Sequence, residues 1–117
     1  TFRNLNIGDN CFLGNAVLLD LSAPITLGDH VTLSERVMIL THLNVGYKDH
    51  PLQKYFPPRC NPVTIERGTF IGAASLILDG IIIGPKTFIG ACSLVNTPIP
   101  AHSLAAGNPC KVLRKLT

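Results

Sequence analysis

The sequence contains no tryptophan, a single methionine and few charged residues, which make up 15% of its 117 residues. It also lacks the run of about 20 apolar residues that a membrane-spanning helix requires. The most apolar stretch, residues 75–84, is broken by Asp79 and Gly80. Because 46% of the residues are nevertheless hydrophobic, we expect them to fill a core, a subunit interface or both, with no membrane span.

Two further absences concern nucleic-acid binding and cysteine motifs. The net charge is only +3, and no basic stripe interleaved with aromatic residues is present, so we expect no nucleic-acid partner. The four cysteines are widely spaced and form no CxxC pair, which excludes a zinc knuckle or a dithiol redox motif. Unpaired cysteines of this kind are typical of a reducing compartment, and we expect a cytoplasmic protein.

A six-residue repeat dominates what is present. From residue 65 onward the hexapeptides begin with Ile65, Ile71, Ile77, Ile83, Ile89 and Val95. The second position is glycine in three of these six, and the fifth is small or β-branched in all of them. The N-terminal half shows the same pattern from Ile7 and Leu13, slips by two residues at Leu19 and Asp20, and resumes at Leu21, Leu27, Leu33 and Ile39.

A period of six matches neither the 3.6 residues of a helix nor the two of an ordinary strand. It is typical of a short strand followed by a corner, repeated around a prism so that the leading aliphatic residues point inward and stack. The repeat therefore predicts an all-β solenoid spanning residues 1–117 as a single domain. The alternative is a β-sandwich of short strands.

The repeat fails between residues 43 and 62. This segment contains four prolines, both tyrosines and several charged residues. Long loops in compact domains are usually functional or disordered, and this one has too much aromatic character for a plain linker. We predict an ordered arm that leaves the prism at about 43–62 and covers a site or packs on a neighbouring subunit. A tolerated surface insertion is the alternative.

Among the four histidines, His42 has the most suggestive position. His30 and His102 lie in segments expected to form solvent-exposed corners, and His50 lies within the arm. His42 lies where the last regular strand gives way to the arm, a usual place for a catalytic group. General base catalysis needs a group that titrates near neutral pH, for which histidine is suited. Judged alone, a histidine at a strand end is more often structural.

The repeat of an aliphatic residue, glycine, two variable residues, a small residue and a variable one resembles that of the hexapeptide-repeat acyltransferases. The resemblance implies a left-handed, three-sided parallel β-helix. Residues 39–42, the arm and the resumption at 62–65 look like the maltose, galactoside and polysaccharide O-acetyltransferase branch, which implies that His42 is the general base. The group that orients it is left open among Asp20, Glu35, Asp49 and a backbone carbonyl.

The C-terminal segment, residues 89–115, resembles the closing coil and tail of the same family. Lys111 and Arg114 can bind phosphates of coenzyme A through charge-assisted hydrogen bonds; a solvated basic terminus is the alternative. The resemblance implies further coenzyme-A contacts at Phe70, Ala73, Ala91, Asn96 and Thr97.

Together these features predict direct transfer from acetyl-CoA, as a co-substrate, to a sugar or glycan hydroxyl, with no permanent cofactor and no metal. The resemblance also implies a homotrimer with sites between subunits. Composition agrees, since several large apolar residues end their hexapeptides outside the inward column. Three alternatives stay open: N-acetylation of an amino sugar, a γ-class carbonic-anhydrase-like metalloenzyme, for which only His42 and His50 are available, and a non-enzymatic solenoid.

Overall fold

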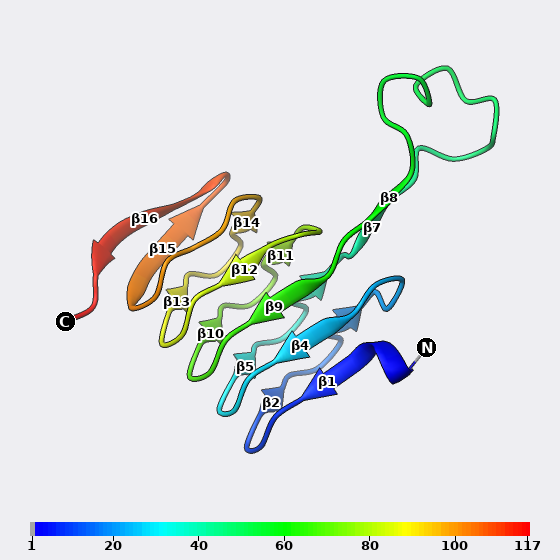
Figure 1. Ribbon diagram of the computed structural model, residues 1–117. Coiled ribbons are helices and arrows are strands. Elements are labelled where there is room, and N and C mark those ends of the chain that lie inside the picture. Colours follow the sequence, from blue (N-terminus) through cyan, green and yellow to red (C-terminus); the bar gives the residue numbers. More distant parts are fainter. Residues whose placement is uncertain (1) are drawn as a thin grey trace.

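The computed structural model describes residues 2–117, in which the chain winds repeatedly through three sheets of parallel strands and ends in one antiparallel strand (Figure 1). A short 3-10 helix, η1 (Phe2–Asn4), precedes the first strand. The first sheet contains β1 (Leu5–Ile7), β4 (Ile25–Leu27), β9 (Val63–Ile65) and β12 (Ile82–Ile83). The second contains β2 (Phe12–Leu13), β5 (Thr32–Leu33), β10 (Phe70–Ile71), β13 (Phe88–Ile89), β15 (Ser103–Gly107) and β16 (Cys110–Lys115). The third contains β3 (Leu18–Leu19), β6 (Met38–Ile39), β11 (Leu76–Ile77) and β14 (Leu94–Val95).

Each coil gives one strand to each sheet, and the repeat explains the resulting core. Between the third and fourth coils paired residues are 18 apart, as Phe70 and Phe88 are, so three hexapeptides make one coil. The six leading residues of the C-terminal half stack on one another inside the prism and are fully buried. The fifth positions are buried too, and the hydroxyls of Thr69 and Ser75 donate to the carbonyls of Gly84 and Gly90. The predicted inward column is confirmed.

The N-terminal half departs from the predicted frame. Leu19 pairs with Ile39 across the third sheet, so Leu19 itself belongs to the inward column. The slip therefore does not begin at Leu19: the two extra residues lie beyond it, in the corner that leads to β4. Leu21, expected to lead the next hexapeptide, instead packs partly buried at the edge of the core.

The arm leaves the prism through a separate pair of strands. β7 (His42–Leu43) and β8 (Arg59–Cys60) pair antiparallel, and residues 44–58 form a loop that stands out from the stack of coils (Figure 1). Arg59 binds Asp79 through Nε at 2.8 Å and Nη2 at 3.1 Å, which fastens the base of the arm to the third coil. Tyr47, Tyr55 and Phe56 are exposed on the loop.

The three outer faces of the prism differ in character. Outward positions of the second sheet carry Phe12, Thr32, Phe70, Phe88 and Leu104. Those of the third sheet are all apolar: Leu18, Met38, Leu76 and Leu94. The first sheet instead presents Asn6, Thr26, Thr64 and Ile82. Two adjacent faces are thus apolar and the remaining one is mostly polar. Within residues 2–117, no helix has the length and apolar character needed to span a bilayer.

Candidate active site

His42 begins β7 at the corner between the third and first sheets, where the prism meets the arm. Its side chain is 46% exposed, which leaves one edge of the ring open. Its Nδ1 lies 2.5 Å from Oδ2 of Asp20 and 3.3 Å from Oγ of Ser22, both on the preceding coil. The ring is therefore held through Nδ1, and Nε2 is the nitrogen left for chemistry.

Asp20 is the carboxylate that orients His42, among the candidates the sequence left open. Its Oδ1 accepts hydrogen bonds from the N–H of Ser22 at 3.1 Å and from the Ser22 hydroxyl at 2.7 Å. Its Oδ2 accepts the N–H of Thr41 at 2.8 Å as well as the contact from His42. Partial burial alone would raise the pKa of Asp20, but these hydrogen bonds, led by that of Thr41, hold it well below its ordinary value.

An ionised Asp20 has a direct chemical consequence for His42. A carboxylate beside Nδ1 fixes the orientation of the imidazole and stabilises the imidazolium that forms when Nε2 accepts a proton. Glu35 lies at a different corner, against Gly14, and Asp49 lies in the loop of the arm.

Two residues of this site, Ser22 and Thr41, were not identified from the sequence. Thr41 is fully buried, and its hydroxyl donates to the carbonyl of Asp20 at 2.8 Å and accepts the N–H of Ala23 at 2.9 Å. The sequence feature that could have pointed to them is the two-residue slip, because it coincides with an acidic residue in an otherwise regular repeat.

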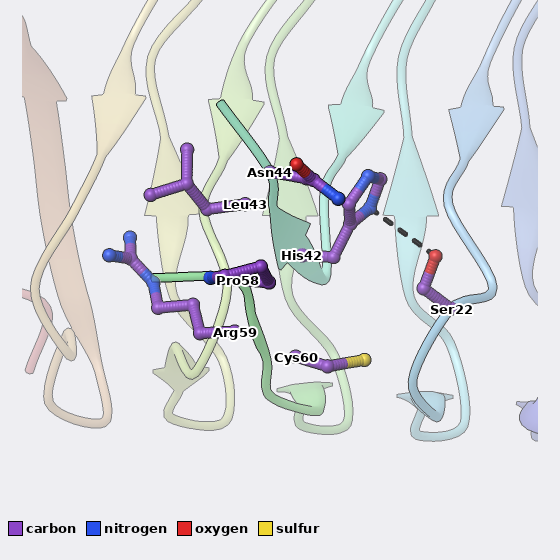
Figure 2. Close-up of a pocket in the computed structure, with 7 residues that line it drawn as sticks. All are labelled: Ser22, His42, Leu43, Asn44, Pro58, Arg59 and Cys60. Atoms are coloured by element: carbon purple, nitrogen blue, oxygen red, sulfur yellow. Dashed lines mark hydrogen bonds between the residues drawn. The ribbon is translucent and has the colours of Figure 1, made fainter. Parts of the chain in front are cut away.

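A cavity of about 280 Å³ opens beside His42 at the base of the arm. It is lined by Ser22, His42, Leu43, Asn44, Pro58, Arg59 and Cys60. Figure 2 shows the His42 ring facing the Ser22 hydroxyl, whereas the Arg59 guanidinium extends away from both. The lining combines hydrogen-bonding groups with apolar surface, which is the character of a site for a small polar ligand.

The residues expected to contact coenzyme A fall into two groups. Asn96 and Thr97 follow β14 at the same corner as His42, two coils further along the prism. Ala73 and Ala91 follow β10 and β13 at the other edge of the third sheet. Phe70 lies on the outer face of the second sheet, where its ring stacks on that of Phe88 with the ring centroids 4.7 Å apart. One chain therefore does not bring these groups together, because the width of the third sheet separates them.

Lys111 and Arg114 both lie on the exposed strand β16, and a bulge aligns them. Residues three apart on a regular strand face opposite sides. Here the register shifts, so that Lys111 lies opposite Ala106 and Arg114 lies opposite Leu104, two residues apart on β15. Both basic residues consequently share one face with Phe88, the partner of Leu104 on β13.

No three His, Cys, Asp or Glu side chains within residues 2–117 are grouped closely enough to hold a metal ion.

The sequence of this chain is similar to a hexapeptide-repeat model and to known acetyltransferases. The sequence model described as the hexapeptide repeat of succinyl-transferase matches residues 5–34 and 62–96. The galactoside O-acetyltransferase of Escherichia coli is 31% identical over 93% of this chain. The chain spans only 56% of that protein, and little more than half of the other curated relatives it matches.

Solved structures of acetyltransferases also superpose on this chain. A hexapeptide-repeat acetyltransferase of Vibrio cholerae, crystallised with acetyl-coenzyme A, superposes with a TM-score of 0.88 at 31% identity, over 98% of this chain and 62% of that one. A maltose O-acetyltransferase of Clostridium difficile superposes with a TM-score of 0.85 at 35% identity, over 97% of this chain and 60% of that one.

Proposed function

Because the chain belongs to the hexapeptide-repeat acyltransferase family, we propose that it transfers the acetyl group of acetyl-CoA to a hydroxyl of a sugar or glycan. The observation that carries the proposal is His42, held through Nδ1 by Asp20 at the mouth of the cavity. The names of the relatives support the donor and the acceptor class. We also propose that the coils of this chain wind in the left-handed sense that is typical of the family.

The chemistry follows from this arrangement. The acceptor hydroxyl enters the cavity and gives its proton to Nε2 of His42 as its oxygen attacks the thioester carbonyl. Asp20 stabilises the resulting imidazolium, and backbone N–H groups stabilise the oxyanion. When the tetrahedral intermediate collapses, the C–S bond breaks and the imidazolium returns its proton to the thiolate of coenzyme A. Transfer is direct, and Asp20 acts as a positioning residue.

A turnover screen with acetyl-CoA against mono- and oligosaccharides tests the function. Release of free coenzyme A that depends on a sugar without an amino group supports transfer to oxygen. The bond formed is then an ester, which hydroxylamine cleaves, whereas an amide survives. Turnover only with amino sugars and an amide product would establish the N-acetylation alternative, and turnover of neither would reject both.

We expect Arg114→Ala to raise the KM for acetyl-CoA about threefold to tenfold while leaving kcat nearly unchanged. A hydrogen bond to a charged group contributes roughly 1.5–3 kcal/mol, and the exposure of β16 reduces that through solvent screening. Steady-state kinetics with coenzyme-A and dephospho-coenzyme-A thioesters measure the effect. Lys115→Ala is the matched control, because Lys115 is not one of the two residues, Lys111 and Arg114, that we propose bind the phosphates. An unchanged KM would assign Lys111 and Arg114 to a solvated tail.

The working unit in this proposal is a homotrimer. The apolar second face of one copy packs on the apolar third face of the next, and the polar first face stays in solvent. Such a contact repeats around a threefold axis and brings the His42 corner of one copy to the Phe70 and Ala91 surface of its neighbour. The exposed aromatic residues of the arm find a partner in the same way.

Specific activity should therefore fall when the protein is diluted until trimers dissociate, because each isolated chain holds only one part of the site. Shortening the arm between residues 46 and 56 should lower activity more than it lowers the melting temperature. Light scattering and activity measured on the same dilution series check the first expectation. Activity and thermal unfolding of the shortened variant, compared with the full chain, check the second. A monodisperse monomer with full specific activity would refute the trimer.

A further inference from the structure

At the corner that leads to β4, the first coil has two more residues than the third coil has at its equivalent corner. Leu19 and Leu27, the inward residues on either side of this corner, are eight positions apart. Ile77 and Ile83, at the equivalent corner of the third coil, are six apart. A merely tolerated insertion would bulge into solvent. This one is bonded at both ends to the second coil through the buried Thr41, which contacts the Asp20 carbonyl and the Ala23 N–H.

Ser22 lies between those two anchors, in the extra length of chain. Both its N–H and its hydroxyl donate to Oδ1 of Asp20, at 3.1 and 2.7 Å. The opposite oxygen, Oδ2, is thereby presented to the N–H of Thr41 and to His42. Ser22 Oγ itself also lies 3.3 Å from Nδ1 of His42.

This arrangement determines which ring nitrogen carries the proton. The single hydroxyl proton of Ser22 is used on Asp20, so toward His42 its oxygen offers only lone pairs. Nδ1 therefore meets two acceptors, Asp20 Oδ2 and Ser22 Oγ. It must be the protonated nitrogen, which leaves the lone pair of the neutral ring on Nε2 of this cavity-lining residue.

We propose that Ser22 is a positioning residue that fixes His42 in the tautomer protonated at Nδ1, and that the two extra residues of the first coil supply it. Without the Ser22 hydroxyl, Oδ1 of Asp20 keeps only the backbone N–H of residue 22 as a donor, and the carboxylate is held less firmly about its χ2 angle. The ring then loses one of its two acceptors and samples the tautomer in which Nε2 is protonated and cannot act as a base. The effect on rate rests on the proposed function, whereas the effect on the tautomer does not.

The test compares Ser22→Ala and Ser22→Thr with Ser34→Ala, a serine at a corner away from the site. Nitrogen-15 NMR of the histidine rings in the full chain reports the tautomer, and steady-state kinetics report kcat and KM. We expect Ser22→Ala to shift His42 toward the other tautomer and to lower kcat about threefold to tenfold, the size of one neutral hydrogen bond. The KM for acetyl-CoA should not change. Ser22→Thr, which keeps the hydroxyl, should restore both values, and Ser34→Ala should alter neither.

A Ser22→Ala protein with the wild-type tautomer and the wild-type kcat would overturn the proposal. An equal fall of kcat in Ser22→Ala and Ser22→Thr would overturn it too, because the hydroxyl would then be irrelevant. If the wild-type chain transfers no acetyl group, the proposed function fails, and the NMR comparison still decides the role of Ser22.

Discussion

His42→Ala should lower kcat by about 10²–10⁴, the usual contribution of a general base, and leave the affinity for coenzyme A nearly unchanged. Nε2 of this residue is the open nitrogen beside the cavity, since Nδ1 is held by Asp20. Removing the ring deletes the proton acceptor without touching the residues expected to bind coenzyme A. The loss should therefore appear in the chemical step.

The matched control is His50→Ala. His50 lies in the arm, where Nδ1 accepts the N–H of Leu52 at 3.1 Å and the ring packs near Tyr47. Its removal should have a small effect on kcat. Calorimetry with coenzyme A on both variants separates binding from chemistry. If His50→Ala abolished turnover and His42→Ala did not, the assignment of the base would be wrong.

Gly72→Ala should lower the free energy of unfolding by about 3 kcal/mol, the upper end of what overpacking normally costs. A Cβ at residue 72 would lie 2.5 Å from the backbone nitrogen of Ala91 and 2.8 Å from its Cα. These are main-chain atoms of the next coil, so no side chain can swing aside. Relief requires the two coils to separate at this corner, which disturbs the parallel pairing on either side.

Gly80→Ala distinguishes this clash from backbone strain. Gly80 has φ of +80°, but the nearest atom to an added Cβ is Cβ of Asn61 at 3.5 Å, an ordinary contact. Its cost should be about 1 kcal/mol, from the left-handed backbone alone. Urea unfolding at a fixed protein concentration measures both variants. Equal losses for the two would show that the spacing of the coils does not depend on glycine at position 72.

The hexapeptide period was sufficient to predict the prism, because each leading residue has the same surroundings in every coil. Ile71 and Ile89, one coil apart, pair directly and are both fully buried. The same logic placed Phe70 and Phe88 outside the column, where the structure has them stacked. The sequence showed the slip in the first coil, but it did not show that Leu19 stays in the inward column.

The parts that sequence alone did not predict depend on contacts between coils. Asp20 and His42 are 22 positions apart, and only the register of the first two coils shows that Asp20, and not Glu35 or Asp49, contacts His42. The roles of Ser22 and Thr41 follow from the path of the backbone through an irregular corner. The bulge that aligns Lys111 with Arg114 has no periodic signal, because it alters the pairing of two strands only locally.

The most direct test of the central claim, that each active site combines the His42 corner of one copy with the coenzyme-A surface of another, mixes two damaged proteins. His42→Ala removes the base, and Ala91→Trp fills the exposed corner expected to receive pantetheine. Each variant alone should be inactive. After dissociation and joint reassembly in equal amounts, about one quarter of the sites, the fraction expected from random mixing around a cyclic heterologous interface, should contain an intact His42 and an intact Ala91. Recovery of about one quarter of the wild-type turnover of acetyl-CoA is the predicted result. A mixture that forms hybrid trimers and stays as inactive as its parents would show that each site lies within a single chain.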